Sequence, residues 1–235
     1  MILDSYALHS IIVQIQYTDA FLIWDRAGRI ARDVAKIWPS IKFVDGQPNQ
    51  QTLSGKDVQI QTALKQATIT LRGAKALDQN RVRQITETFE LWRDALELLQ
   101  ITRVSARSVY IRKFDSLKAA NVALRALNVV SWPTERVFDQ SMDAGQNGLE
   151  VHFRFEDAVS FTSVRLKAEE LRLEVELDAD FFDQPIKESR CRAVIDFDRG
   201  ILGTIDASKF RMDDWLKGYV HVLRRDLDKV IGSKK

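Results

Sequence analysis

This sequence is short of the residues that cross-link, interrupt or anchor a chain. Its 235 residues include one cysteine, Cys191, four prolines and ten glycines. One thiol cannot form an internal disulfide, which fits a reducing compartment, and no Pro- or Gly-rich linker divides the chain. No apolar run is long enough to span a bilayer, and the segment Met1–Ser5 lacks the charged-then-apolar order of a signal peptide. We therefore expect a cytoplasmic protein with no membrane contact.

Catalytic and nucleotide-binding motifs are missing as well. The chain contains no G-x-x-x-x-G-K-[ST], G-x-G-x-x-G or G-x-S-x-G motif. The chain also lacks an excess of positive charge. It has 35 Lys and Arg residues and 33 Asp and Glu residues, which gives a net charge of +2. Dedicated nucleic-acid-binding domains are usually more basic, although a local patch can lie within a neutral total. These absences favour a non-catalytic protein and give no reason to predict a cofactor.

What the first part of the chain does contain is a mixture of helical and strand patterns. Apolar residues from Ile23 to Trp38 recur at steps of three and four, which predicts an amphipathic helix that Pro39 ends. A second seam of this kind, from Val82 to Leu99, predicts a helix that packs on a sheet or on another helix. We expect strands near 11–16, 41–44, 58–64, 67–72 and 103–114, a polar loop at 45–57, and helices at 23–38, 80–99 and 116–128.

The second part changes to period-two alternation. Leu149–Phe155, 171–177 and 191–197 each alternate apolar with charged or polar residues, which is typical of antiparallel strands with one buried face. A fourth strand is expected near 158–166, and apolar residues from Met212 to Val230 predict a closing helix. The order of elements predicts the α+β class, with antiparallel sheets and helices on one face, and a C-terminal four-stranded meander closed by a helix. We expect two subdomains, 1–130 and 131–235, packed as one compact unit.

Some local motifs resemble a profile-defined family of uncharacterised, sporadically distributed prokaryotic proteins. The resemblance rests on Ile12–Gln16, Ile37–Pro39, Gln47–Asn49 and Thr102–Arg107, and it covers the first half to two thirds of the chain. In that family the last strand reads more like Arg-Ile-Gly-Leu-Arg, whereas Ser105 and Ala106 stand here in place of Gly-Leu. The resemblance implies horizontally moved genes and a role in defence or toxin control, but no particular chemistry.

The most suggestive candidate site is a basic strand. Arginines that alternate along a strand can hold phosphates through bidentate hydrogen bonds. The candidate phosphate or nucleic-acid ligands are Arg72, Arg103, Arg107, Arg112 and Lys113. The alternation places Arg103, Arg107 and Lys113 on one face, while few aromatic residues lie between them. The competing interpretation is an exposed face whose arginines pair with acids on neighbouring strands.

A metal site is the second candidate. Asp196 and Asp198 lie two residues apart on one strand, so their carboxylates face the same way and can hold a divalent ion. The acidic group of Asp178, Asp180 and Asp183 fits a solvated turn better than a calcium loop. The remaining candidates are better explained without a ligand: His9, His152 and His221, the thiol of Cys191, and Trp24, Trp38, Trp92, Trp132 and Trp215.

Three functions remain open from the sequence. The first is a non-catalytic interaction or accessory protein, the second a nucleic-acid or nucleotide-phosphate binder, and the third a metal-dependent enzyme. A protein partner or a homodimer is expected, and the 80–99 helix is proposed to pair with a symmetry mate through Val82, Phe89 and Trp92.

Overall fold

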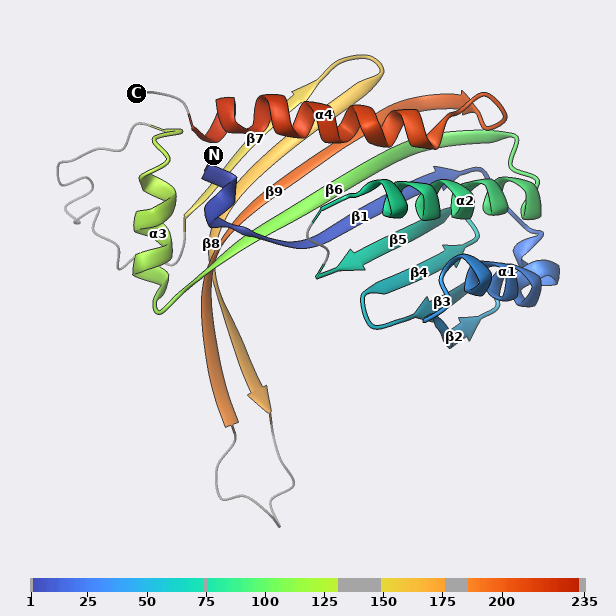
Figure 1. Ribbon diagram of the computed structural model, residues 1–235, viewed down its shortest axis with the longest axis horizontal. Helices are drawn as coiled ribbons and strands as arrows, with labels where there is room; N and C mark the ends of the chain where they lie inside the picture. The colour runs from blue at the N-terminus through green and yellow to red at the C-terminus, as the bar shows by residue number, and fades with distance from the viewer. Residues whose placement is uncertain (1, 74–75, 131–148, 176–185, 233–235) are drawn as a thin grey trace, which may run out of the picture.

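One antiparallel sheet organises the described part of the protein. The computed structural model describes residues 2–73, 76–130, 149–175 and 186–232. Within them, nine strands form a single sheet in the order β2-β3-β4-β5-β1-β6-β9-β8-β7, together with four α-helices (Figure 1). The α+β class is confirmed. The elements are η1 (Ile2–Ser5), β1 (Ala7–Tyr17), α1 (Ile23–Ile37), β2 (Lys42–Gln47), β3 (Gln50–Ser54), β4 (Val58–Ala63), β5 (Gln66–Arg72), α2 (Gln79–Ala95), β6 (Gln100–Phe114), α3 (Leu117–Arg125), β7 (Glu150–Glu156), β8 (Ser160–Val175), β9 (Ile186–Asp206) and α4 (Met212–Ile231).

The chain runs through the same connectivity twice. A long strand, β1, leads into α1 and then into a meander whose last strand, β5, returns beside β1 before α2 begins. Then β6 leads into α3, and the meander β7-β8-β9 brings β9 back beside β6 before α4 begins. The two opening strands, β1 and β6, pair with each other at the centre of the sheet. Among the described residues the sheet and the core are therefore continuous, and the second pass begins at β6.

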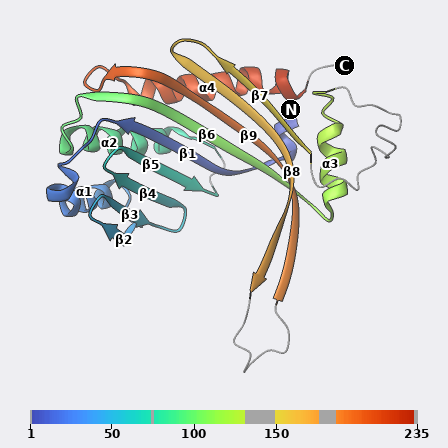
Figure 2. The same ribbon diagram turned by 180° about the vertical axis from the view of Figure 1, so that it is seen from behind.

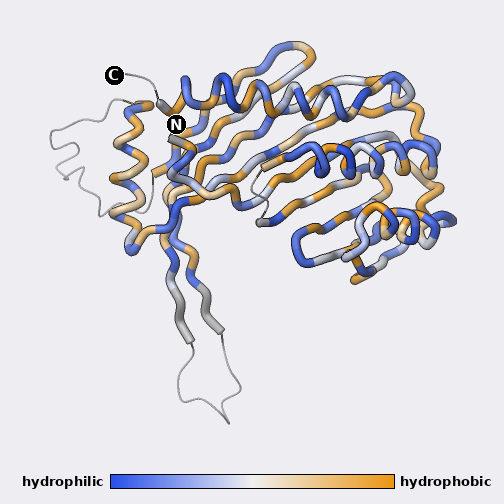
Figure 3. Tube along the Cα trace, in the orientation of Figure 1, coloured by the Kyte–Doolittle hydropathy of each residue, from blue (hydrophilic) through white to orange (hydrophobic). Residues whose placement is uncertain are grey.

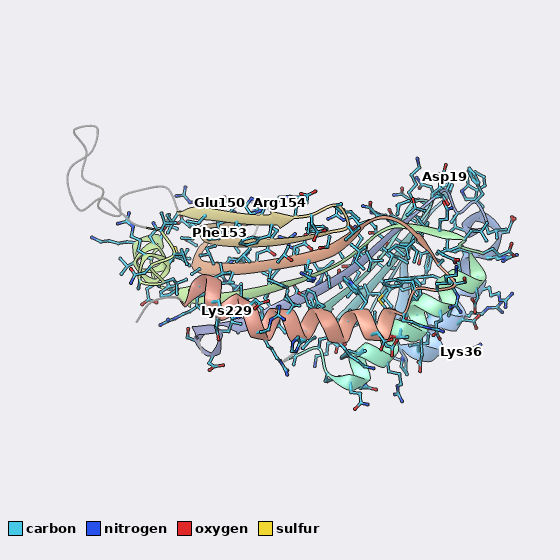
Figure 4. All side chains as sticks on the ribbon, turned by 90° about the horizontal axis from the view of Figure 1, so that it is seen from above. Asp19, Lys36, Glu150, Phe153, Arg154 and Lys229 are labelled. Atoms are coloured by element: carbon cyan, nitrogen blue, oxygen red, sulfur yellow. The ribbon has the colours of Figure 1, made fainter. Side chains whose placement is uncertain are left out.

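Helices α1, α2 and α4 cover one face of this sheet, while α3 lies at its end (Figures 1 and 4). In β1, Ile11, Val13 and Ile15 point toward the helix layer and are buried, whereas Ile12 and Gln14 point to the other face and are half-buried. The strands thus have one apolar face, and the helices cover that face. Hydrophobic and hydrophilic residues also alternate along the helices, as the orange and blue segments of α4 in Figure 3 show. No described helix is both long and apolar enough to cross a membrane.

Buried polar atoms connect the helix layer to itself and to the sheet. The Trp92 indole Nε1 donates to Thr62 Oγ1 of β4 at 3.0 Å, and the Tyr219 hydroxyl of α4 donates to Ser108 Oγ of β6 at 2.7 Å. Trp38 Nε1, just after α1, donates to Thr88 Oγ1 of α2 at 2.8 Å. Each bond satisfies a donor that would otherwise be buried without a partner. These bonds therefore fix the positions of the helices relative to the sheet and to each other.

Three expectations about elements need correction. The polar 45–57 loop contains strand β3, because Pro48 and Asn49 confine the turn to a tight hairpin and leave Gln50–Ser54 to pair. The two strands expected near 158–166 and 171–177 are one strand, β8, since no Gly, Pro or Asn separates them. The α2 seam is inside the fold: Val82, Phe89 and Trp92 are at most 8% exposed, so the proposed dimer interface along α2 loses its basis.

Strands β8 and β9 continue past the rest of the sheet as a two-stranded ribbon (Figures 1 and 2). Strand β7 stops pairing with β8 at Lys167, and β6 stops pairing with β9 at Cys191. Beyond these residues, Leu171–Val175 pairs only with Ile186–Arg190 among the described residues. The ribbon leads toward the acidic group Asp178, Asp180 and Asp183, which lies outside the described residues.

Candidate binding surface on the open sheet face

Figure 2 shows the face of the sheet opposite α1, α2 and α4, here called the open face. The pairing of β6 with β9 brings the two predicted sites together on this face. Arg103 and Arg107 of β6 and Asp196 and Asp198 of β9 all point to it, because alternate residues of a strand share a face. In the β6–β9 register, Arg107 lies opposite Asp198 and Val109 lies opposite Asp196. The predicted arginines and the predicted carboxylates are therefore cross-strand neighbours.

Arg107 binds the more distant of the two aspartates. Its Nε donates to Asp196 Oδ1 at 2.7 Å, and its Nη2 donates to Asp196 Oδ2. The Asp196 side chain is only 10% exposed, whereas that of Arg107 is 45% exposed. The pKa of Arg107 is raised because the hydrogen bond to Asp196 and the nearby negative charge stabilise the charged guanidinium. This bidentate pair occupies both carboxylate oxygens, so Asp196 has little capacity left for a metal ion.

Asp198 is left without such a partner. Its Oδ1 is buried and accepts no hydrogen bond in the structure. Burial raises the pKa of Asp198, against the opposing effect of the positive charges of Arg103, Arg107 and Arg154. Among the described residues, no group of three or more His, Cys, Asp or Glu side chains is arranged to hold a metal ion. The two aspartates thus have different roles: Asp196 is paired, and Asp198 is a partly desolvated acid among arginines.

An aromatic ring forms the base of this arginine cluster. Phe161 of β8 packs against Gly200 of β9 and is 2% exposed. The guanidinium carbons of Arg103 and Arg154 lie 4.7 Å and 5.3 Å from the centre of the ring. Both distances are within the range of cation–π attraction. The ring is therefore covered on the open face by two strands' arginines and is closed to a stacking base.

Beside this cluster lies a small hollow of about 180 Å³. Its apolar lining is Val109 and Val194, and its charged lining comes from β6, β8 and β9. Each cation of the hollow is paired with an acid: Lys167 binds Glu169 at 2.7 Å, Arg192 also binds Glu169, and Arg165 binds Glu150 at 3.3 Å. We call this cavity the hollow; it is lined by Arg107, Val109, Arg165, Lys167, Glu169, Arg192, Val194 and Asp196.

Figure 4 shows the alternation at the sheet edge next to the hollow. Glu150 and Arg154 lie on the side of β7 away from α4, whereas Phe153 lies on the side of the helix layer. Lys229 marks the position of α4 in the same view. The acid of this edge, Glu150, reaches inward to Arg165, and Glu156 binds Arg154 at 2.6 Å. The edge therefore takes part in the same network of paired charges.

The remaining basic candidates do not converge on the hollow. Arg72 faces the open side but lies on β5, beyond β1, where it donates to Gln59 Oε1 at 2.8 Å. Lys113 faces the same side, opposite Arg192. Arg112 points to the opposite face and lies over the Phe114 ring at 5.0 Å. Sequence reasoning also left out Arg154, Phe161, Arg165, Lys167, Glu169 and Arg192, although their alternation in the C-terminal strands was visible.

The other single residues of interest lie outside the cluster or outside the described residues. Burial first, and then the charges of Arg192 and Arg72, lower the pKa of His9. His152 shares a 2.7 Å hydrogen bond with Ser163, and Cys191 is half-buried with a free thiol. Trp24 is not a core residue, since it is 56% exposed and contacts Phe21 at 5.2 Å between ring centres. Trp132 lies outside the described residues.

The other half of the open face carries almost no charge. It is formed by β1, β5, β4 and β3, whose outward residues are amides and hydroxyls such as Gln14, Gln61 and Thr68. Gln14 Nε2 donates to Gln66 Oε1 at 3.3 Å on the neighbouring strand. The open face is thus divided at the β1–β6 boundary into a neutral half and a charged half.

A search with protein-family models and a search of curated protein sequences find no match to this chain. The resemblance to the sporadic prokaryotic family therefore stays a prediction.

Proposed function

We propose that this chain is a non-catalytic interaction protein that binds a protein partner through its open face. The observation that carries the proposal is a broad sheet surface, uncovered by α1, α2 and α4, on which most charges are already matched within the molecule. With strands about 4.8 Å apart and about 3.3 Å per residue, nine strands give a surface roughly 40 Å wide. At that width, strands as long as the 7-residue β5 give roughly 900 Å², and a stable interface needs about 800 Å² per partner.

The electrostatics favour a protein over a nucleic acid. A nucleic-acid surface needs cations that are free to neutralise phosphates and rings that are free to stack on bases. Here Arg107, Arg165 and Arg192 are engaged by carboxylates, and the Phe161 ring is buried. Matched charges beside a neutral amide surface give polar complementarity without a strong positive field, which suits a protein partner. The family resemblance adds an accessory role in bacterial defence or toxin control to this proposal.

Site-specific photocrosslinking in the cells that carry the gene tests the surface. A photoreactive amino acid replaces Thr68 in the neutral half, Ser163 in the charged half, or Lys229 on α4 as the matched control, since Lys229 is 69% exposed on the opposite layer. We expect the same partner protein to crosslink from Thr68 and Ser163 and not from Lys229. Equal crosslinking from all three positions, or from Lys229 alone, would place the partner elsewhere and overturn the proposal.

Phosphate binding is the competing function, and one observation favours it: the hollow has four cations against two carboxylates. Its test is titration with RNA and DNA at several salt concentrations, because each neutralised phosphate contributes roughly 0.7–0.9 to the slope of log K against log salt. We expect no binding with a steep salt dependence. Tight, salt-dependent binding that is lost in the Arg103→Ala, Arg107→Ala double variant would replace the protein partner with a nucleic acid.

A further inference from the structure

The two edges of the sheet are finished in different ways. The β7 edge alternates charged or polar side chains, Glu150, His152, Arg154 and Glu156, with apolar ones that face the helix layer. All six residues of the β2 edge are exposed, including Phe43 at 60% and Val44 at 62%. An exposed edge with apolar residues is a template for pairing with another strand. The β2 edge is therefore the stronger candidate for a contact.

A bulge gives β2 an unusual arrangement of charges. Lys42 pairs with Ser54 of β3 and Phe43 with Leu53, but the next pair is Asp45 with Thr52, so Val44 is the extra residue. Ser54 and Thr52 lie on the same face of β3, which is the open face. The bulge thus places Lys42 and Asp45 on one face, although three positions separate them, and leaves Phe43 on the other face over Gly46.

This arrangement is complementary to itself. If β2 is laid antiparallel against a second copy of β2, with the two-fold axis between Phe43 and Val44, each Lys42 lies opposite the partner's Asp45 and each Phe43 lies opposite the partner's Val44. Opposite charges directly across a strand pair are stabilising, and isologous two-fold contacts require such self-complementarity. We propose that β2 is the edge through which two copies of this chain pair, extending the sheet across a two-fold axis.

The second copy is the occupant that fits best because both the charges and the apolar residues match in a single register. The contact is independent of the open-face proposal, since it uses the strand edge and not the face. Pairing buries Phe43 and Val44 but only a short strand, so we expect a dimer that dissociates on dilution rather than an obligate one.

Sedimentation velocity of the full chain over roughly a hundredfold range of concentration tests the pairing. We expect a concentration-dependent dimer for the unaltered chain. The Asp45→Lys variant sets like charges opposite Lys42 and should be monomeric over the same range. The double exchange Lys42→Asp, Asp45→Lys restores the opposite charges and should restore the dimer. Asp115→Lys, an exposed charge reversal before α3, is the matched control and should leave the dimer intact.

The charge exchange separates pairing from misfolding, because its rescue requires a folded chain. A monomer at every concentration for the unaltered chain would overturn the proposal. So would a dimer that Asp45→Lys leaves unchanged, since the contact would then lie elsewhere, or a double exchange that fails to dimerise while its circular dichroism matches that of the unaltered chain.

Discussion

The two halves of the open face perform the same structural task with different chemistry. Both continue the same sheet and lie on the same side of it, yet β3, β4, β5 and β1 present amides and hydroxyls, whereas β6, β9, β8 and β7 present paired charges. The neutral half forms weak, replaceable contacts such as Gln14 to Gln66. The charged half contains partly buried groups whose removal leaves a partner unsatisfied. Tolerance to substitution should therefore differ between the two halves of this single sheet.

The largest effect is expected at Gly200 of β9, where an added side chain has no room. A Cβ atom there would lie 2.4 Å from Phe161 Cε1 and 2.6 Å from the Val104 carbonyl oxygen, a backbone atom that cannot easily move. We expect Gly200→Ala to lower the free energy of unfolding by about 3 kcal/mol, measured by urea denaturation. The control is Gly218→Ala on α4, where nothing lies within 4 Å and a gain of roughly 0.5–1 kcal/mol is expected. Equal effects at both glycines would contradict the close packing of Phe161.

The next effect is expected on breaking the bidentate pair. Arg107→Met leaves the Asp196 carboxylate, 10% exposed, without its two donors. A fully buried pair would cost about 3–5 kcal/mol to break, but Arg107 is nearly half exposed, so we expect a loss of about 2 kcal/mol. The variants Arg107→Met, Asp196→Asn and their combination form a double-mutant cycle, measured by urea denaturation. Strictly additive losses would show that the pair is not energetically coupled.

A smaller effect of opposite sign is expected at Asp198. Because burial raises its folded pKa, the ionised carboxylate opposes folding once the pH rises through that pKa, and this cost is absent below the unfolded pKa. Asp198→Asn should therefore increase stability at pH 7 by about 1 kcal/mol. At about pH 3 it should change stability little. Thermal unfolding of both chains across this pH range checks the sign. Destabilisation at pH 7 would contradict this sign. It would mean that attraction between the surrounding arginines and the Asp198 carboxylate outweighs the desolvation cost of that carboxylate.

The smallest effect is expected in the neutral half. Thr70 of β5 faces the open side and is half-buried, and no ion pair depends on it. We expect Thr70→Val to change the free energy of unfolding by less than about 0.5 kcal/mol, since both residues are β-branched and the position has no charged partner. A loss as large as that of Arg107→Met would remove the distinction between the halves.

Much of the fold was predictable because its signals are local. The β1, β5 and β6 strands and the α1, α2 and α4 helices lie where period-two and three-to-four patterns place them. Ser116 accepts from the backbone N–H of Ala119 at the start of α3, and Asn128 adopts a positive φ of 52° after its end, as expected for a helix cap and a helix terminator. The predictions for β3, expected as part of a loop, and for β8, expected as two strands, were wrong. The boundaries of these strands depend on pairing with neighbouring strands rather than on the local pattern.

The candidate surface was predictable only in part. Alternation correctly assigned Arg103, Arg107 and Lys113 to one face and Asp196 and Asp198 to one face of their strand, and both belong to the same open face. It could not show that β9 returns beside β6, which pairs Arg107 with Asp196. It also could not assign Arg154 and Phe161 to the same cluster, because they come from strands that meet only in the sheet.

The sequence by itself determined the α+β class and the side of each strand that is buried, because these depend on the spacing of apolar residues along the chain. Only the tertiary structure decided which strands are neighbours, and therefore which charges neutralise each other. It also decided that the apolar seam of α2 is buried inside the fold and which edge of the sheet stays exposed. The physical reason is that cross-strand contacts join residues far apart in sequence, such as Arg107 and Asp196, and no local pattern encodes their distance.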